Sequence, residues 1–118
     1  MSWEVMLVDE DTDSSLCSKN SIQEGGTQVA GGTNNCELNI TYNYSPLYYE
    51  VFPNDEGLKW LYGKTGREAR EVLRIAVTRL GTKRNDDYWK ATMGNAGIAL
   101  SILHGWAKEH KDGVFKVY

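Results

Sequence analysis

The chain has 118 residues, of which 41% are hydrophobic and 25% charged, proportions typical of one globular domain and not of a disordered chain. Its formal net charge of −3 argues against nonspecific nucleic-acid binding, which usually needs a basic surface. No apolar run approaches the roughly 18 residues of a membrane helix, and the first residues lack the basic region of a secretion signal. We therefore expect a cytoplasmic protein in which Cys17 and Cys36 are free thiols, because that compartment is reducing.

The first part of the chain is predicted to form strands and turns. An opening strand is expected at 2–8 and a weaker one at 15–22, with an acidic loop between them. The triplet Gly-Gly-Thr occurs at 25–27 and again at 31–33, which predicts tight turns around a short extended piece. A strand with alternating apolar and polar residues follows at 36–44. It ends before Pro46, which cannot continue a sheet.

From Ser45 onward the sequence predicts helices. Pro46 suits the first turn of a short helix that Pro53 ends, and another helical turn closes at Gly63. Thr65-Gly66-Arg67-Glu68 fits a capping box and predicts a helix at 65–80. A last helix is expected from about 94 to 110, with a closing strand at 114–118.

These elements predict an α+β fold, in which a small antiparallel sheet packs against C-terminal helices in a single domain. The strand-rich part covers about 1–45 and the helical part about 46–112. Helical spacing in the 65–80 segment predicts one set of residues that faces the core and a second set, three arginines, that faces solvent. The inward residues are Val72, Leu73, Ala76, Val77 and Leu80, and the outward residues are Arg67, Arg70 and Arg74.

The candidate motifs for metal, phosphate and catalytic sites are incomplete. Gly63-Lys64-Thr65 lacks the upstream glycine of a phosphate-binding loop, and the acidic run at 9–13 lacks the later residues of a calcium loop. His104 and His110 are six residues apart, which is not the spacing of a helical metal pair. We therefore predict no metal site, no cofactor and no catalytic residue from the spacing.

One strand carries an unusual polar face, with two asparagines where β propensity disfavours them. We hypothesise a binding site in which amides and hydroxyls form a floor, threonines of the glycine-rich segment lie beside it, and aromatic rings form a lid. The competing interpretation is that the asparagines cap turns or bridge strands, and that Tyr42 and Tyr44 pack in the core. The floor is Asn39, Thr41 and Asn43, the flanking threonines are Thr27 and Thr33, and the lid is Tyr48, Tyr49 or Trp89.

Further aromatic residues could stack on a base or fill a partner's pocket. These are Trp60, Tyr62 and Tyr88, together with Tyr42 and Tyr44 if they are exposed. A stripe of small residues in the last helix, Gly97, Ser101 and Gly105, predicts packing against the 65–80 helix. A homo-oligomer contact is the alternative use of this stripe.

Several sequence blocks together resemble a family of small proteins carried by bacteriophages and prophages. They are GGTQVAGGT, LNITYNYSP, YGKTG, DDYWKATMGNA and DGVF, and the resemblance covers about 25–115. It implies an accessory phage protein acting in the cytoplasm of the infected bacterium, and it provides no activity or catalytic residue. The serine-rich N-terminal region and the Tyr118 end depart from the family's pattern.

The resemblance and the residues together favour a binding protein that counters a host defence system. Such a protein would block a defence protein or sequester a nucleotide signal, without a membrane partner. The alternatives are a small nucleotide-processing enzyme, with acidic or histidine side chains brought together by the fold, and a structural or regulatory phage protein with no role in defence.

Overall fold

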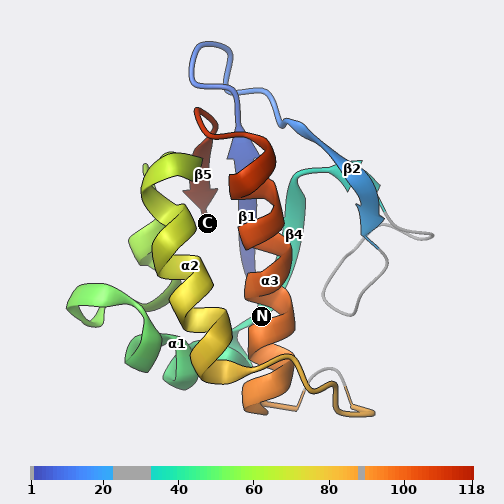
Figure 1. The fold of residues 1–118 in the computed structure, drawn as a ribbon, viewed down its shortest axis with the longest axis vertical. Coiled ribbons are helices and arrows are strands. Elements are labelled where there is room, and N and C mark those ends of the chain that lie inside the picture. Colours follow the sequence, from blue (N-terminus) through green and yellow to red (C-terminus); the bar gives the residue numbers. More distant parts are fainter. Residues whose placement is uncertain (1, 23–32, 88–89) are drawn as a thin grey trace.

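A three-stranded antiparallel sheet in the order β4-β1-β5 forms one layer of the structure, and helices cover one of its faces (Figure 1). This computed structural model describes residues 2–22, 33–87 and 90–118. β1 (Ser2–Val8) is the central strand, between β4 (Glu37–Thr41) and β5 (Val114–Val117). The predicted α+β class is confirmed.

The register of the sheet explains which strand residues are buried. Val5 lies opposite both Leu38 and Val117, and Leu7 lies opposite Phe115. All five are buried, because side chains alternate between the two faces of a strand and this set shares the face under the helices. The opposite face of the sheet carries Glu4 and Met6, together with their polar cross-strand neighbours on β4, Asn39 and Glu37.

A second ladder of two strands lies beside the sheet. β2 (Cys17–Ile22) pairs antiparallel with β3 (Thr33–Asn35), and Figure 1 shows this ladder to one side of β4. The strand predicted at 15–22 is therefore present from Cys17, and Ser15 adds an isolated bridge to Val8. The predicted Gly-Gly-Thr turns fall almost wholly within 23–32, outside the described residues.

Short helical segments connect the sheet to the two long helices. A 3-10 turn, η1 (Tyr42–Tyr44), leads into α1 (Ser45–Val51), which is followed by η2 (Pro53–Asp55) and η3 (Gly57–Leu61). Pro46 occupies the first turn of α1, where its missing N–H costs nothing. The predicted breaks at Pro53 and Gly63 are both found.

The two long helices begin at the predicted caps. α2 (Gly66–Leu80) has a full capping box, in which Glu68 N donates to Thr65 Oγ1 (3.2 Å) and Thr65 N donates to Glu68 Oε1 (3.0 Å). α3 (Met93–Glu109) is capped by Thr92, whose hydroxyl accepts a hydrogen bond from Asn95 N (3.1 Å). Local sequence alone determines these helix starts, since each cap satisfies backbone donors that lack a helical partner.

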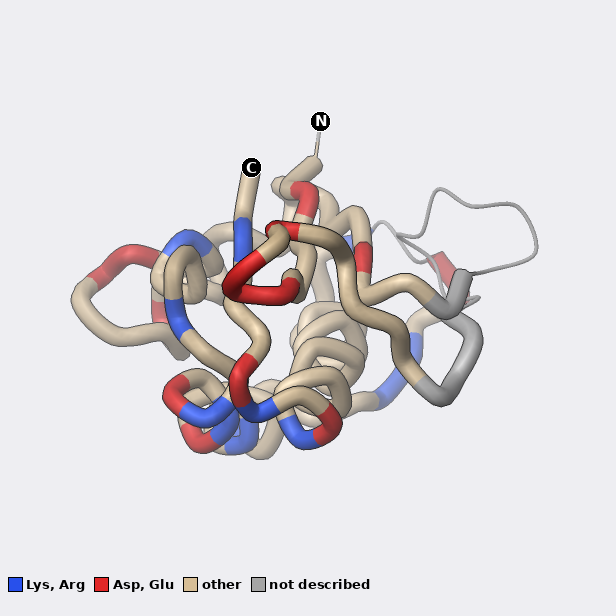
Figure 2. Tube along the Cα trace, turned by 90° about the horizontal axis from the view of Figure 1, so that it is seen from above, with Lys and Arg blue, Asp and Glu red and all other residues tan. Residues whose placement is uncertain are grey.

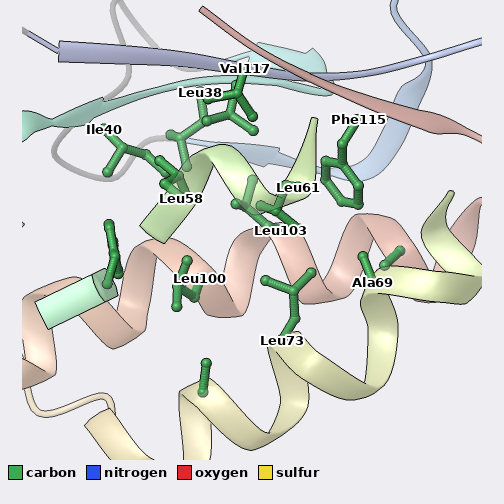
Figure 3. Packing of buried hydrophobic residues seen from close by; sticks show 14 of the residues in the cluster. Leu38, Ile40, Leu58, Leu61, Ala69, Leu73, Leu100, Leu103, Phe115 and Val117 are labelled. Carbon is green, nitrogen blue, oxygen red and sulfur yellow. The ribbon is translucent and has the colours of Figure 1, made fainter. Parts of the chain in front are cut away.

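The core lies between the sheet, η3 and the two long helices (Figure 3). On α2 the fully buried residues are Ala69, Leu73 and Ala76, while Val72 and Val77 are half-buried and the predicted outward arginines are exposed. Figure 2 shows basic and acidic residues mixed along the outer side of α2. Within the described ranges, no helix is long and apolar enough to cross a membrane.

α2 and α3 lie side by side (Figure 1) and approach closely at both ends through glycine. A Cβ on Gly97 of α3 would overlap the carbonyl oxygen of Gly81, and a Cβ on Gly66 of α2 would overlap that of His110. Gly97 therefore packs against the end of α2, as predicted for the small-residue stripe. Within the described part of the chain, a Cβ on Gly105 would point into open space, so the stripe divides into a packed end and an open end.

We expect Leu73→Ala to lower the free energy of unfolding by about 2–5 kcal/mol, because it leaves a cavity in a fully buried position. Ile75→Ala is the matched control on the same helix, since Ile75 is 44% exposed and its truncation should cost well under about 1 kcal/mol. Urea denaturation of both variants measures the difference. Equal losses would show that α2 packs with another face inward.

Two of the three glycines of α3, Gly97 and Gly105, should respond oppositely to alanine. Gly97→Ala forces the helices apart and should cost at least about 2 kcal/mol, as overpacking against backbone does. In Gly105→Ala the added methyl group points into open space. This variant should stabilise the helix by up to about 1 kcal/mol, because alanine is the better helix former. Thermal melts of the two variants check this, and a destabilised Gly105→Ala would mean that another backbone occupies that position.

Candidate functional site

The predicted polar floor does not form on one strand. β4 ends at Thr41, and Asn43 belongs to the turn η1, so the strand prediction for 42–44 was wrong. The cause is local, because Thr41 Oγ1 accepts a hydrogen bond from Asn43 N (3.2 Å) and caps the turn. Threonine and asparagine side chains compete with the sheet in this way for backbone groups.

The three floor residues have different environments. Asn39 lies on the outer face of β4, where its Oδ1 accepts a hydrogen bond from Ser2 Oγ (3.0 Å). Thr41 is 6% exposed and acts as a cap, whereas the side chain of Asn43 is exposed. For Asn39 the structure shows a bond that bridges two strands, as in the competing interpretation, and Thr41 has a capping role that neither interpretation predicted.

The lid residues are also separated. Tyr48 is fully buried, and its hydroxyl donates to the carbonyl oxygen of Ala96 (3.0 Å), so it is a core residue and cannot cover a ligand. Burial raises the pKa of Tyr48 well above its usual range. Tyr49, one residue later on α1, is 49% exposed and remains accessible. Thr27 and Trp89 lie outside the described residues, as does the side chain of Thr33.

Three lysines each lie over an aromatic ring near the start of β1 and the end of β5. The distances from Nζ to the ring centroid are 5.4 Å for Lys59 over Trp3, 5.0 Å for Lys64 over Trp60 and 5.2 Å for Lys116 over Tyr62. Tyr42 contacts Trp3, and Tyr118 contacts Tyr62. We call this set the lysine–aromatic surface: Trp3, Tyr42, Lys59, Trp60, Tyr62, Lys64, Lys116 and Tyr118.

Backbone pairing places the chain segments that carry these residues near one another, with Trp3 and Tyr118 on opposite faces of the sheet. Glu4 and Tyr118 exchange two backbone hydrogen bonds of 2.8 and 2.9 Å, which places the start of β1 beside the end of the chain. The segment after η3 is attached to β5, since Gly63 N donates to Phe115 O (2.8 Å) and Phe115 N donates to Lys64 O (2.9 Å). Gly63 has φ +81°, a conformation that suits glycine at such a turn.

Tyr62 and Tyr118 form the most exposed part of this surface. They are 48% and 58% exposed, and their rings meet edge to face with centroids 6.0 Å apart and an interplanar angle of 86°. The hydrogen bond with Tyr62 raises the pKa of Tyr118, and Asp13 adds to the shift as the smallest contribution. Large rings left this exposed on a folded protein are available for a partner.

Sequence analysis found only part of the lysine–aromatic surface. Tyr42, Trp60 and Tyr62 were named as candidates for stacking, but Trp3, Tyr118 and the lysines were not. The available signal was the segment KWLYGK at 59–64, which contains two lysines and two aromatic residues. The remaining residues are contributed by strand ends that only the fold brings near.

Comparisons of the chain with protein-family models, with curated proteins and with solved structures each found no match. The function must therefore be argued from the geometry of the chain itself.

A polar cleft of about 580 Å³ lies where β1 and α3 end. It is lined by Asp9, Glu10, Asp11, Leu16, Glu109, His110, Lys111, Asp112 and Gly113, and Figure 2 shows acidic residues along the loop after β1. Ser18 Oγ donates to Glu109 Oε1 (3.0 Å), and His110 Nε2 lies 2.6 Å from the carbonyl oxygen of Cys17. These bonds attach β2 to the end of α3, and among the described residues the hydrogen-bond partner of His110 Nε2 is a backbone carbonyl oxygen.

Both cysteines are free, and they lie in different environments. Cys17 is exposed and lies opposite Asn35 in the β2–β3 ladder, with its Sγ 3.8 Å from Asn35 Oδ1. Cys36, which follows Asn35 in the chain, is fully buried. Burial raises the pKa of the Cys36 thiol to about 12, and the Glu109 carboxylate adds to the shift. The Cys36 thiol is thus held neutral in the core.

We expect iodoacetamide at pH 8 to modify Cys17 and leave Cys36 intact, because only a thiolate reacts and Cys36 is both buried and neutral. Peptide mass spectrometry measures the two sites, and denaturant should expose Cys36. Thermal melts with and without reductant should coincide. Rapid modification of Cys36, or a disulfide in the native protein, would contradict this account.

The same thiol predicts a loss of stability at high pH. An unfolded Cys36 ionises near its ordinary pKa of 9.0, while the folded one ionises near about 12. Ionisation therefore favours the unfolded chain between these values, and stability should fall as the pH rises above about 9. Denaturation at pH 8 and pH 10 tests this, with Cys17→Ser as the control that keeps the pH dependence.

Proposed function

We propose that the protein acts by binding through the lysine–aromatic surface, and that its target belongs to a bacterial defence system. The observation that supports this is the set of three lysines, each 5.0–5.4 Å from the centre of an aromatic ring. The surface would take a nucleotide signal out of solution or cover a defence protein. The resemblance to small phage proteins supplies the defence setting.

The composition of the surface suits binding. Aromatic side chains give large contact areas with few rotatable bonds, and they are enriched at the centres of interfaces. The lysines add positive charge to a chain whose formal net charge is −3, so an anionic target is attracted to this region. Exposed contacts between an ammonium group and a ring contribute only about 0.5–1 kcal/mol each. A ligand can therefore displace the lysines from the rings at small cost.

The test compares defence activity with and without the lysines. The protein is expressed in bacteria that carry a nucleotide-signalling defence system, and phage plaques are counted. We expect the wild-type chain to restore plaques and the triple variant Lys59→Ala, Lys64→Ala, Lys116→Ala to lose most of this effect. Three cations at roughly 0.5–1 kcal/mol each correspond to a loss of affinity of about ten- to a hundredfold.

Lys83→Ala is the matched control, because Lys83 is exposed in the connector after α2 and lies outside the lysine–aromatic surface. Circular dichroism melts of all variants separate loss of binding from loss of folding. A folded triple variant with full activity would exclude this surface. A wild-type chain that restores no plaques against any such system would exclude the defence role.

A further inference from the structure

We infer that the β2–β3 ladder opens and closes as a unit on the rest of the domain, and that side-chain bonds to the end of α3 hold it closed. The hinge of this movement is at Leu16 and Cys36. The latch is formed by Glu109 and His110. The inference goes beyond the proposed function, because it does not use the lysine–aromatic surface.

The ladder has little apolar surface of its own. β2 has six residues and β3 has three, and Ile22 is the one aliphatic residue among them. Of the ladder side chains that the structure describes, those of Cys17 and Asn35 are exposed and that of Ser18 is buried. An isolated two-stranded ladder is only marginally stable in water. A segment with few buried apolar groups opens more readily than the core beside it.

The two residues that flank the ladder are fixed to the body of the domain. Leu16 N donates to Leu7 O (3.0 Å), Leu7 N donates to Cys36 O (3.0 Å), and Cys36 N donates to Leu16 O (2.8 Å). The Cys36 side chain is fully buried, and Leu16 packs against the hydrophobic core beside Gly113. The anchored residues therefore end where the ladder begins, which places the hinge at this pair.

Two side chains at the end of α3 hold the ladder against the domain. Ser18 Oγ donates to Glu109 Oε1 (3.0 Å). His110 Nε2 lies 2.6 Å from Cys17 O, and because a carbonyl oxygen only accepts, this nitrogen carries the proton. The net contribution of such bonds is modest, so they close the ladder without locking it. Glu109 and His110 also line the polar cleft, so opening of the ladder changes one wall of that cleft.

Hydrogen exchange of the full chain, followed by mass spectrometry at increasing urea below the unfolding transition, tests the inference. We expect the amides of β2 and β3 to exchange at a common rate, at least about tenfold faster than those of β1 and α3. Their exchange should also depend less on urea, because a local opening exposes less surface than global unfolding does.

Ser18→Ala and Glu109→Ala remove the same hydrogen bond from its two sides. Each should speed exchange of the ladder by a further factor of about ten or more, because the bond has a charged acceptor. Glu109→Gln should retain most of the protection, since its amide oxygen can accept the same bond. Iodoacetamide gives a second readout, because Cys36 belongs to the body of the domain and should stay unmodified in these variants.

Ser15→Ala is the matched control. Ser15 Oγ donates to Glu37 Oε1 (2.7 Å), which is a bond of the same type on the body side of the hinge. Its loss should leave the exchange rate of the ladder unchanged, and equal loosening by Ser15→Ala would overturn the assignment of the hinge.

Three other results would overturn the inference. Wild-type ladder amides that exchange at the rate of β1 would show that the ladder does not open separately. Wild-type ladder amides without protection would show that no closed state exists. If Ser18→Ala and Glu109→Ala speed exchange of β1 as much as that of the ladder, or expose Cys36 to iodoacetamide, the bond stabilises the whole domain and is not a latch.

Discussion

The antiparallel pairing of β1 with β5 is the constraint on which both the core and the candidate binding surface depend. On the inner face it places Leu7 opposite Phe115, two fully buried side chains. At its end it joins Glu4 to Tyr118 through two backbone hydrogen bonds. The same strand pairing therefore positions buried side chains at the centre of the core. It also brings the first aromatic residue of the chain near the last one.

β5 has a second role, because it anchors the segment that carries the lysines. Gly63 and Lys64 are hydrogen-bonded to Phe115, and an isolated bridge joins Thr65 to Val114. α2 begins directly after this attachment, so its first turn is fixed to the sheet as well as to the end of α3. A change that loosens β5 would thus disturb the binding surface and the helix pair together, whereas a change at the far end of α2 would affect packing alone.

The parts of the fold that the sequence predicted are those with a local cause. The capping box at Thr65 and Glu68 needs only residues three apart, and Pro46 needs only its own ring to favour a first turn. Thr41 shows the limit of this reasoning, because alternation predicted strand through 44 while its hydroxyl instead caps a turn. A period-two pattern cannot tell a strand residue from a capping residue whose side chain bonds two positions ahead.

The candidate surface was predictable only in part for a different reason. KWLYGK is contiguous, but Lys59 lies over Trp3 near the start of the chain and Tyr62 contacts Tyr118 at its end. The position of these two ends depends on the register between strands more than a hundred residues apart in sequence. Tyr48 and Tyr49 illustrate the same point in adjacent positions. The Tyr48 hydroxyl donates a hydrogen bond to a backbone carbonyl oxygen and its ring lies in the core, whereas the Tyr49 ring is exposed to solvent.

Charge limits which targets the lysine–aromatic surface could bind under the proposed function. The formal net charge of the chain is −3, so a long polyanion in contact with its surface would meet carboxylates over most of its length. Salt screens exposed charges that are more than roughly 8–10 Å apart at physiological ionic strength, so under the proposed function the three lysines would act mainly on groups in direct contact with them. The acidic composition that argues against nonspecific nucleic-acid binding is therefore compatible with the proposed binding role only where the target carries its negative charge locally, within reach of the lysines.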